Sequence, residues 1–253
     1  MPALVAAVKN SYSKPSNLFI NGKIILSEEG TTQGDPLAMP MYGIALLPLI
    51  ELCKQDRVTQ KWYADDGNGA GKLKDLRILV DKLQEHGPSF GYNVIKCNLI
   101  TKPEKVDEAK KLFSGCEIEI VEGHRVLGSV IGAEHTCAEF IAEQSNAFIK
   151  LLRKLSAIAK SSPQNAFKAL TSGIQHKLTF IARTTPLSRE LLESAEAIIA
   201  KELIPAMVSN TAYNEKFRQI FSLPIREGGL SIMLPEDREH DYEKSRLLSN
   251  ILA

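Results

Sequence analysis

Two adjacent aspartates are the residues of this sequence best suited to carry chemistry. Asp65 and Asp66 follow an aromatic residue and a small one, in the order Tyr63-Ala64-Asp65-Asp66, and Gly67 comes next. Adjacent like charges repel each other, so folding alone gives no reason to place them at the end of a strand. A hard divalent cation such as Mg²⁺ favours the arrangement, because it binds carboxylate oxygens together with substrate phosphates. The alternative is a solvated turn, since Asp and Gly are ordinary turn residues.

A β-hairpin is expected to hold this pair. Residues 58–63 are predicted to form its first strand, and the glycine-rich tract 67–71 is interpreted as flexible chain that includes a short second strand. Apolar residues recur at helical spacing over 72–86, and Gly87-Pro88 should end that helix. The two carboxylates would then lie at the tip of a hairpin next to an amphipathic helix.

A second hairpin and a helix are predicted upstream. Asn21-Gly22 lies between two apolar runs, which is the strongest short-range signal for a hairpin. Asp35-Pro36 is expected to open a helix that runs to about Cys53, with Asp as the N-cap and Pro at the first helical position.

The character of the chain changes near residue 134. Before it we expect a strand over 92–100, a helix from Pro103 to about Phe113, a strand over 117–120, and a turn with a short return strand within 123–132. After it we expect helices at about 136–160, 164–183, 187–203, 213–222 and 237–251. The fold class is therefore predicted as α+β, with a mixed domain over 1–134 and a helical domain over 135–253.

Composition and cysteine usage restrict the class of protein. The 253 residues are 44% hydrophobic and 24% charged, which is ordinary for a globular protein that buries a core. The four cysteines form no C-x-x-C pair, so we expect no structural zinc and a reducing compartment. The longest apolar stretch, residues 37–53, contains two prolines and a glutamate and favours a buried helix over a membrane span. We therefore expect no membrane partner, no secretion, and an intracellular location in the cytoplasm or nucleus.

One stretch of the helical half is strongly basic. The net charge is only +1, so a site for nucleic acid would have to be local. Residues 144–183 contain no Asp or Glu, and Lys150, Arg153 and Lys154 fall on one helix face by their spacing. Stripes of this kind bind phosphate backbones. A solvated basic face is the alternative.

Four short motifs occur in a fixed order along the chain. They are Gln33-Gly34-Asp35-Pro36-Leu37, Tyr63-Ala64-Asp65-Asp66, Gly87-Pro88-Ser89-Phe90-Gly91-Tyr92 with Lys96, and Leu127-Gly128. Together they resemble the palm of a reverse transcriptase, an RNA-directed DNA polymerase, most closely of the non-LTR retrotransposon type. The resemblance covers about residues 12–132, and the helical remainder resembles a thumb or connection region.

The resemblance implies RNA-templated DNA synthesis by two-metal nucleotidyl transfer, with Mg²⁺ or Mn²⁺ as cofactor and with dNTPs and an RNA or DNA template–primer as partners. Asp65 and Asp66 match the family's metal-binding, catalytic carboxylates, and Tyr63 would lie near the template–primer end. Lys96 matches a candidate proton donor to pyrophosphate, although an exposed strand lysine is the alternative.

Two further motifs would contact the template and primer. Gln33 and Gly34 match the segment that packs against the nascent base pair and the template, where glycine permits close backbone approach. Leu127 and Gly128 match the turn that grips the primer, with an apolar core turn as the alternative. Gly91-Tyr92 is interpreted as structural.

The chain departs from the family pattern in one respect. Palm polymerases use a further aspartate from an earlier strand, whereas the first aspartate of this chain is Asp35. The basic fingers region of the family is not recognised either. We therefore expect a partial palm followed by a thumb-like region, inactive by itself unless an N-terminal part of the same polyprotein completes it. A non-catalytic nucleic-acid-binding remnant and a domesticated scaffold are the alternatives.

Overall fold

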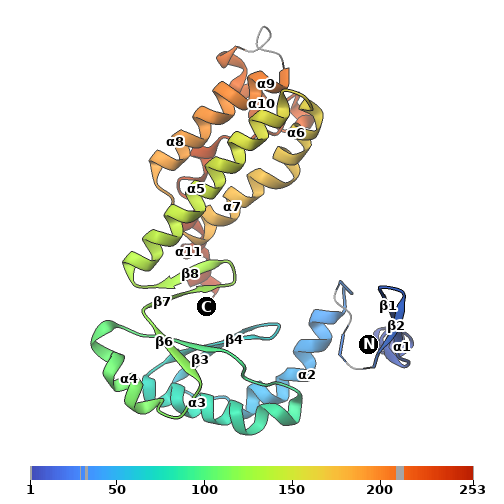
Figure 1. The fold of residues 1–253 in the computed structure, drawn as a ribbon, viewed down its shortest axis with the longest axis vertical. Helices are drawn as coiled ribbons and strands as arrows, with labels where there is room; N and C mark the ends of the chain where they lie inside the picture. Colours follow the sequence, from blue (N-terminus) through green and yellow to red (C-terminus); the bar gives the residue numbers. More distant parts are fainter. Residues whose placement is uncertain (1, 29, 32–33, 209–213, 253) are drawn as a thin grey trace. The chain divides into compact units, whose positions relative to one another are not determined.

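The computed structural model describes residues 2–28, 30–31, 34–208 and 214–252. The chain divides into a mixed unit, residues 1–99 and 104–120, and a helical unit, residues 100–103 and 121–253. Helices and small antiparallel sheets together confirm the α+β class (Figure 1). The hairpin over 123–132 groups with the helices, so the division between units falls near 121, earlier than residue 134. The assignment of the two units to a palm and a thumb stays a prediction.

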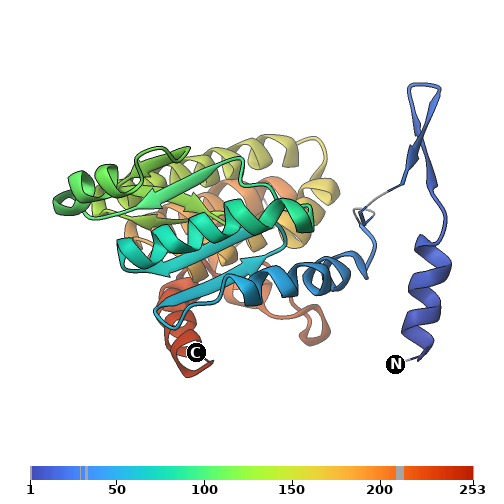
Figure 2. The ribbon, with the colours of Figure 1, turned by 90° about the horizontal axis from the view of Figure 1, so that it is seen from below.

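The mixed unit begins with a helix and a hairpin. They are α1 (Pro2–Tyr12), β1 (Ser16–Ile20) and β2 (Lys23–Ser27), drawn in dark blue in Figure 2. Asn21 and Gly22 both have positive φ, 50° and 75°, which is the geometry of a type I′ turn and confirms the predicted hairpin. Large apolar side chains on both faces of this hairpin are exposed, from 41% for Leu18 to 74% for Phe19.

Helix α2 (Ala38–Leu52) begins later than the sequence predicts. Asp35 Oδ1 accepts a hydrogen bond from the backbone N–H of Leu37 at 2.7 Å, and Ala38 N–H donates to the carbonyl of Asp35 at 3.0 Å. The aspartate therefore caps a turn that precedes the helix, and Pro36 lies in that turn. The Tyr12 hydroxyl also donates to Asp35. The hydrogen bond from Tyr12 has the largest effect on the Asp35 carboxyl, followed by the one from Leu37. Both lower its pKa because they favour the charged form.

A hairpin and a helix form the main core of the mixed unit. They are β3 (Val58–Tyr63), β4 (Asp66–Gly71) and α3 (Leu73–His86), and α3 lies against the hairpin (Figure 2). The predicted hairpin and helix are confirmed, but the tract 67–71 is a paired strand and not flexible chain. A Cβ at Gly69 would lie 2.7 Å from Cδ2 of Leu79, so glycine allows the helix to approach the strand closely.

The rest of the mixed unit is a small second core. It consists of β5 (Cys97–Ile100), η2 (Pro103–Lys105), α4 (Val106–Leu112) and β6 (Ile118–Val121), packed around Leu99, Ala109 and Phe113. The strand predicted over 92–100 is shorter than expected and begins at Cys97. The first residues of the predicted strand instead close the turn after η1 (Gly87–Phe90), where Tyr92 N–H donates to the carbonyl of Gly87 at 3.0 Å.

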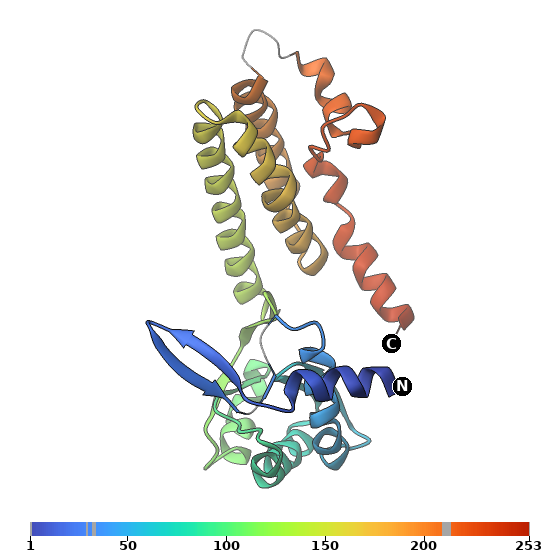
Figure 3. The ribbon, with the colours of Figure 1, turned by 90° about the vertical axis from the view of Figure 1, so that its right-hand side faces the viewer.

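The helical unit opens with a hairpin and continues as a bundle. Its hairpin is β7 (Gly123–Val126) and β8 (Ser129–Gly132). The bundle contains α5 (Glu134–Ala159), α6 (Pro163–Ala169), α7 (Gln175–Thr184), α8 (Arg189–Ile198), α9 (Ile204–Val208), α10 (Arg218–Ser222) and α11 (Asp241–Leu252). Figure 3 shows α5 running alongside the other helices. The predicted helices are present, but two differ in extent. The helix predicted over 187–203 continues to Val208. The helix predicted over 213–222 begins at Arg218, and residue 213 lies outside the described residues.

Two π-helical segments interrupt the middle of the bundle. Leu170–Ile174 (η3) joins α6 to α7, and Ile199–Leu203 (η4) joins α8 to α9. The buried core around them includes Phe148, Leu152 and Leu178. Within the described ranges, no helix is long and apolar enough to cross a membrane.

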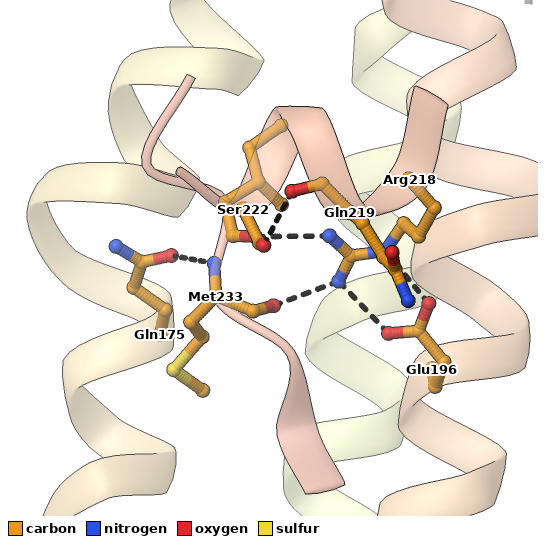
Figure 4. A network of polar contacts seen from close by, with 7 residues as sticks. Gln175, Glu196, Arg218, Gln219, Ser222 and Met233 are labelled. Atoms are coloured by element: carbon orange, nitrogen blue, oxygen red, sulfur yellow. Dashed lines mark hydrogen bonds and ion pairs between the residues drawn. The ribbon is translucent and has the colours of Figure 1, made fainter. Parts of the chain in front are cut away.

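A buried arginine ties the bundle together. Arg218 donates from Nε and Nη2 to the two carboxylate oxygens of Glu196, at 2.7 and 2.8 Å (Figure 4). Its Nη1 and Nη2 also donate to the carbonyls of Ile232 and Met233, at 2.9 and 2.8 Å. The guanidinium thereby links α10, α8 and the segment 231–233, and its charge is both paired and hydrogen-bonded.

A second side chain holds the same segment from the opposite helix. Gln175 Nε2 donates to the carbonyl of Ser231 at 3.2 Å, and Met233 N–H donates to Gln175 Oε1 at 3.4 Å. Ile232 lies between these contacts and is 1% exposed. The two polar side chains therefore satisfy the backbone of a segment that the core buries.

We predict that Arg218→Ala lowers the free energy of unfolding by roughly 3–5 kcal/mol, because it leaves the Glu196 carboxylate and two carbonyls without their donor. Thermal and urea unfolding followed by far-UV circular dichroism measure the change. Arg189→Ala is the matched control, since Arg189 and Glu193 form an ion pair on the exposed surface of α8. The control should change stability by less than about 0.5 kcal/mol. Equal losses in the two variants would contradict the role assigned to Arg218.

Candidate functional site

The turn between β3 and β4 presents both aspartates to solvent. The last strand pair is Tyr63 with Asp66, so Ala64 and Asp65 form a two-residue turn. Ala64 has φ of 52°, whereas Asp65 has negative φ, which is the pattern of a type II′ turn. Both carboxylates are exposed, and so is the Tyr63 ring at 61%. The sequence therefore places two carboxylates and an aromatic ring at one exposed tip.

Aromatic side chains brace this tip from below. The Tyr92 hydroxyl donates to the carbonyl of Asp65 at 3.1 Å. The rings of Trp62 and Tyr92 meet edge to face, with centroids 5.4 Å apart. A Cβ at Gly67 would lie 2.8 Å from the Trp62 ring, so this strand position accepts only glycine without movement of the ring. The structural interpretation of Tyr92 agrees with these contacts.

Two tyrosine hydroxyls lie in the field of the Asp65 charge. Burial raises the pKa of Tyr42, on α2, and the negative charge of Asp65 adds to the effect. Burial also raises the pKa of Tyr92, with smaller contributions from Tyr42 and Asp65. Both hydroxyls therefore stay protonated at neutral pH, and the Tyr92 hydroxyl donates to the turn. Sequence reasoning missed Tyr42, because no pattern connects a residue of an apolar helix to a turn later in the chain.

Asp65 and Asp66 offer the type of ligand that a hard divalent cation prefers, but too few ligands to hold the ion. Carboxylate oxygens are the ligands that Mg²⁺ and Mn²⁺ prefer. Across the residues that the structure describes, no group of three or more His, Cys, Asp or Glu side chains could hold a metal ion. Two-metal phosphoryl chemistry uses ligands that bridge both ions, and two adjacent carboxylates alone do not supply them. We therefore derive no catalytic step through a metal.

Three further predicted residues belong to the mixed unit, and one of them lies outside the described residues. Lys96 is exposed and immediately precedes β5. Gly34 has φ of 93°, which explains the glycine, and no atom lies within 4 Å of a Cβ placed there. The prediction for Gln33 falls outside the described residues.

The Leu127-Gly128 turn packs on α7 of the helical unit. Both residues have positive φ, 49° and 81°, as a type I′ turn requires. A Cβ at Gly128 would lie 3.3 Å from Cζ of Phe180, and Ser129 Oγ donates to the carbonyl of Thr184 at 3.3 Å. Leu127 is 51% exposed, so the alternative of an apolar core turn is wrong.

The predicted basic stripe lies on the solvent side of α5. Lys150, Arg153 and Lys154 are exposed, whereas Phe148 and Leu152 on the opposite side are buried. Among the described residues, no ion pair neutralises any of the three cations. The stripe is thus a local concentration of positive charge in a chain with little net charge.

The candidate residues therefore form two groups, one in each unit. The mixed unit carries the Tyr63–Asp66 turn with Tyr92 beneath it, and the helical unit carries the Leu127 turn and the α5 cations. No protein-family model matches the chain, and no curated protein or solved structure matches it at a significant level.

We predict that Ala64→Gly stabilises the hairpin by about 1 kcal/mol, because glycine tolerates the positive φ that strains alanine there. Ala70→Gly in β4 is the control and should instead cost about 0.5–1 kcal/mol, since glycine in a strand loses more backbone entropy on folding. Urea unfolding followed by the fluorescence of Trp62, the single tryptophan, measures both changes. Effects of the same sign would contradict the turn geometry.

Proposed function

We propose that this chain is a nucleic-acid-binding protein of the reverse transcriptase type. One observation carries the proposal: the Tyr63–Asp66 turn holds a non-glycine residue at positive φ directly before two exposed carboxylates. Such backbone strain typically marks functional turns, and its cost persists only where surrounding structure enforces it. Trp62 and Tyr92 provide that structure here. The order of the four motifs adds support from the sequence.

The helical unit supplies the surface for the phosphate backbone. The cations of α5 lie in a stretch, residues 144–189, that contains no Asp or Glu. A phosphate backbone approaching this part of α5 meets three cations that form no ion pair among the described residues, and each neutralised phosphate releases counterions. Binding of this kind depends on the local stripe and not on the net charge of +1.

Nucleotidyl transfer by this chain alone is not part of the proposal. RNA-templated DNA synthesis from dNTPs is the activity that the resemblance implies. Within the described part of the chain, however, only the two carboxylates Asp65 and Asp66 suit the metal site, and a bridging third ligand would have to come from elsewhere. This observation favours the second candidate, a non-catalytic protein that binds template–primer. The two candidates share the binding surface and differ in catalysis.

We predict that replacing Lys150, Arg153 and Lys154 together by Gln weakens binding to a primer–template about tenfold or more in low salt. The slope of log affinity against log salt should become less steep by up to about 3, because up to three phosphate contacts are lost. Fluorescence anisotropy over a salt series measures both quantities.

The matched control replaces Arg189, Arg226 and Arg246 by Gln. It removes the same charge from exposed positions of the helical unit, but each of these arginines lies beside a carboxylate. Its affinity and salt slope should stay close to those of the unmodified protein. Unchanged binding in the Lys150, Arg153 and Lys154 variant would remove the support for a nucleic-acid surface on α5.

We predict that the purified chain does not extend a primer on an RNA or DNA template with Mg²⁺ or Mn²⁺. Rate enhancement in such chemistry depends on metal ions fixed by several ligands, and the described residues provide two adjacent ones. Gel-based extension assays at saturating dNTP test the statement. Extension at the rate of complete polymerases, abolished by Asp65→Asn, would show that the chain does assemble a full metal site.

A further inference from the structure

Helix α7 carries an aromatic ring on its solvent side. Phe180 is 46% exposed, although Leu178, Ile181 and Ala182 on the same helix are buried in the core. A single exposed apolar residue is common on protein surfaces and by itself indicates nothing. The neighbours of this ring and the contacts that hold it distinguish it from such residues.

Basic and polar side chains surround Phe180 along the helix. His176 and Lys177 lie four and three residues before it, and Arg183 and Thr184 lie three and four residues after it. These spacings place all four on the same helix face as the ring. The face is therefore basic above and below an exposed aromatic ring.

Acidic residues are absent from the stretch of sequence that carries α7. The stretch 144–189 around α7 contains no Asp or Glu, and Lys177 and Arg183 are exposed. Throughout the part of the chain that the structure describes, neither cation takes part in an ion pair. Their charges are thus available to a ligand. Solubility alone would account for the two cations but not for the exposed ring between them.

The ring is also held in place at one edge. Its Cζ and Cε1 atoms face Gly128, where a Cβ would lie 3.3–3.4 Å away. The hairpin carrying that glycine is fastened to the end of α7, because Ser129 Oγ donates to the carbonyl of Thr184 at 3.3 Å. A ring fixed at its edge loses little further freedom when a planar ligand stacks on its exposed face.

We propose that Phe180 is a stacking platform for an unpaired base of a single-stranded nucleic acid, with Lys177 and Arg183 binding the flanking phosphates. The inference rests on the proposed function, because it names the form of nucleic acid that the helical unit takes. Three residues of helix rise about 4.5 Å, so the two cations lie one on each side of a stacked base. Every base offers a π-face, so this contact is tolerant of sequence.

The test compares Phe180→Leu with the unmodified protein on a single-stranded oligonucleotide and on a blunt duplex of the same sequence. Leucine keeps the apolar surface but removes the π-face. Affinity for the single strand should fall roughly 5- to 100-fold, whereas affinity for the duplex, whose bases are already stacked, should change less than twofold. Phe180→Trp keeps a π-face and should therefore bind the single strand as the unmodified protein does.

Phe217→Leu is the matched control. Phe217 is an exposed phenylalanine of the same unit, 44% exposed, but its ring already stacks on Phe221 with centroids 6.3 Å apart. Its single-strand affinity should stay unchanged. Circular dichroism melting curves establish that both leucine variants are folded.

An abasic scan locates the contact. Replacing one base of the oligonucleotide by an abasic site should weaken binding of the unmodified protein at one position and have no further effect on Phe180→Leu, because both changes remove the same stack. Equal single-strand affinity of Phe180→Leu and the unmodified protein would overturn this inference and leave the α5 surface standing. No salt-sensitive binding of the unmodified protein to either oligonucleotide would overturn the proposed function itself.

Discussion

The buried guanidinium of Arg218 is the interaction on which the helical unit depends. It neutralises Glu196 of α8, donates to the backbone of 232–233 and lies on α10, so three separate parts of the chain meet at one side chain. Gln175 of α7 holds the same backbone segment from the other side. A buried charge is tolerated only when it is paired and hydrogen-bonded, and this requirement fixes how these elements meet. Because Gln175 lies on α7, this polar centre also ties α7 to the segment 231–233.

The mixed unit depends on a different constraint, the close packing beneath the Tyr63–Asp66 turn. Glycine at positions 67 and 69 of β4 lets the Trp62 ring and α3 come close, where any side chain would interfere. The same tight packing supports a strained alanine before the aspartates and brings the Tyr92 hydroxyl to the Asp65 carbonyl. The strained turn is therefore supported both by Trp62 of the same hairpin and by Tyr92, which follows η1.

Local signals in the sequence were sufficient for the elements but not for the interactions between them. Asn21-Gly22 predicts its hairpin because the φ values that it permits are a local property, and the apolar spacing over 72–86 predicts α3 for the same reason. The predicted start of α2 was wrong because Asp35 caps a turn that precedes the helix. That arrangement depends on partners distant in sequence, such as Tyr12, which donates to Asp35. The charge of Asp65 acts on the Tyr42 hydroxyl, and Gly128 lies against the Phe180 ring. Both interactions join residues far apart in sequence, so no periodicity indicates them.

The π-helical segment Leu170–Ile174 has a consequence for the geometry of the bundle. A π-turn inserts one residue into an α-helix, and one residue corresponds to about 100° of rotation about the helix axis. The side chains of α7 are therefore rotated about the helix axis from where an uninterrupted α-helix would place them. Helix α6 packs against α5 and α9, and α7 packs against α11. The direction in which the outer face of α7 points is thus set by an insertion of one residue. Deletion of one residue from 170–174 would turn that face away while leaving the sequence of α7 itself unchanged.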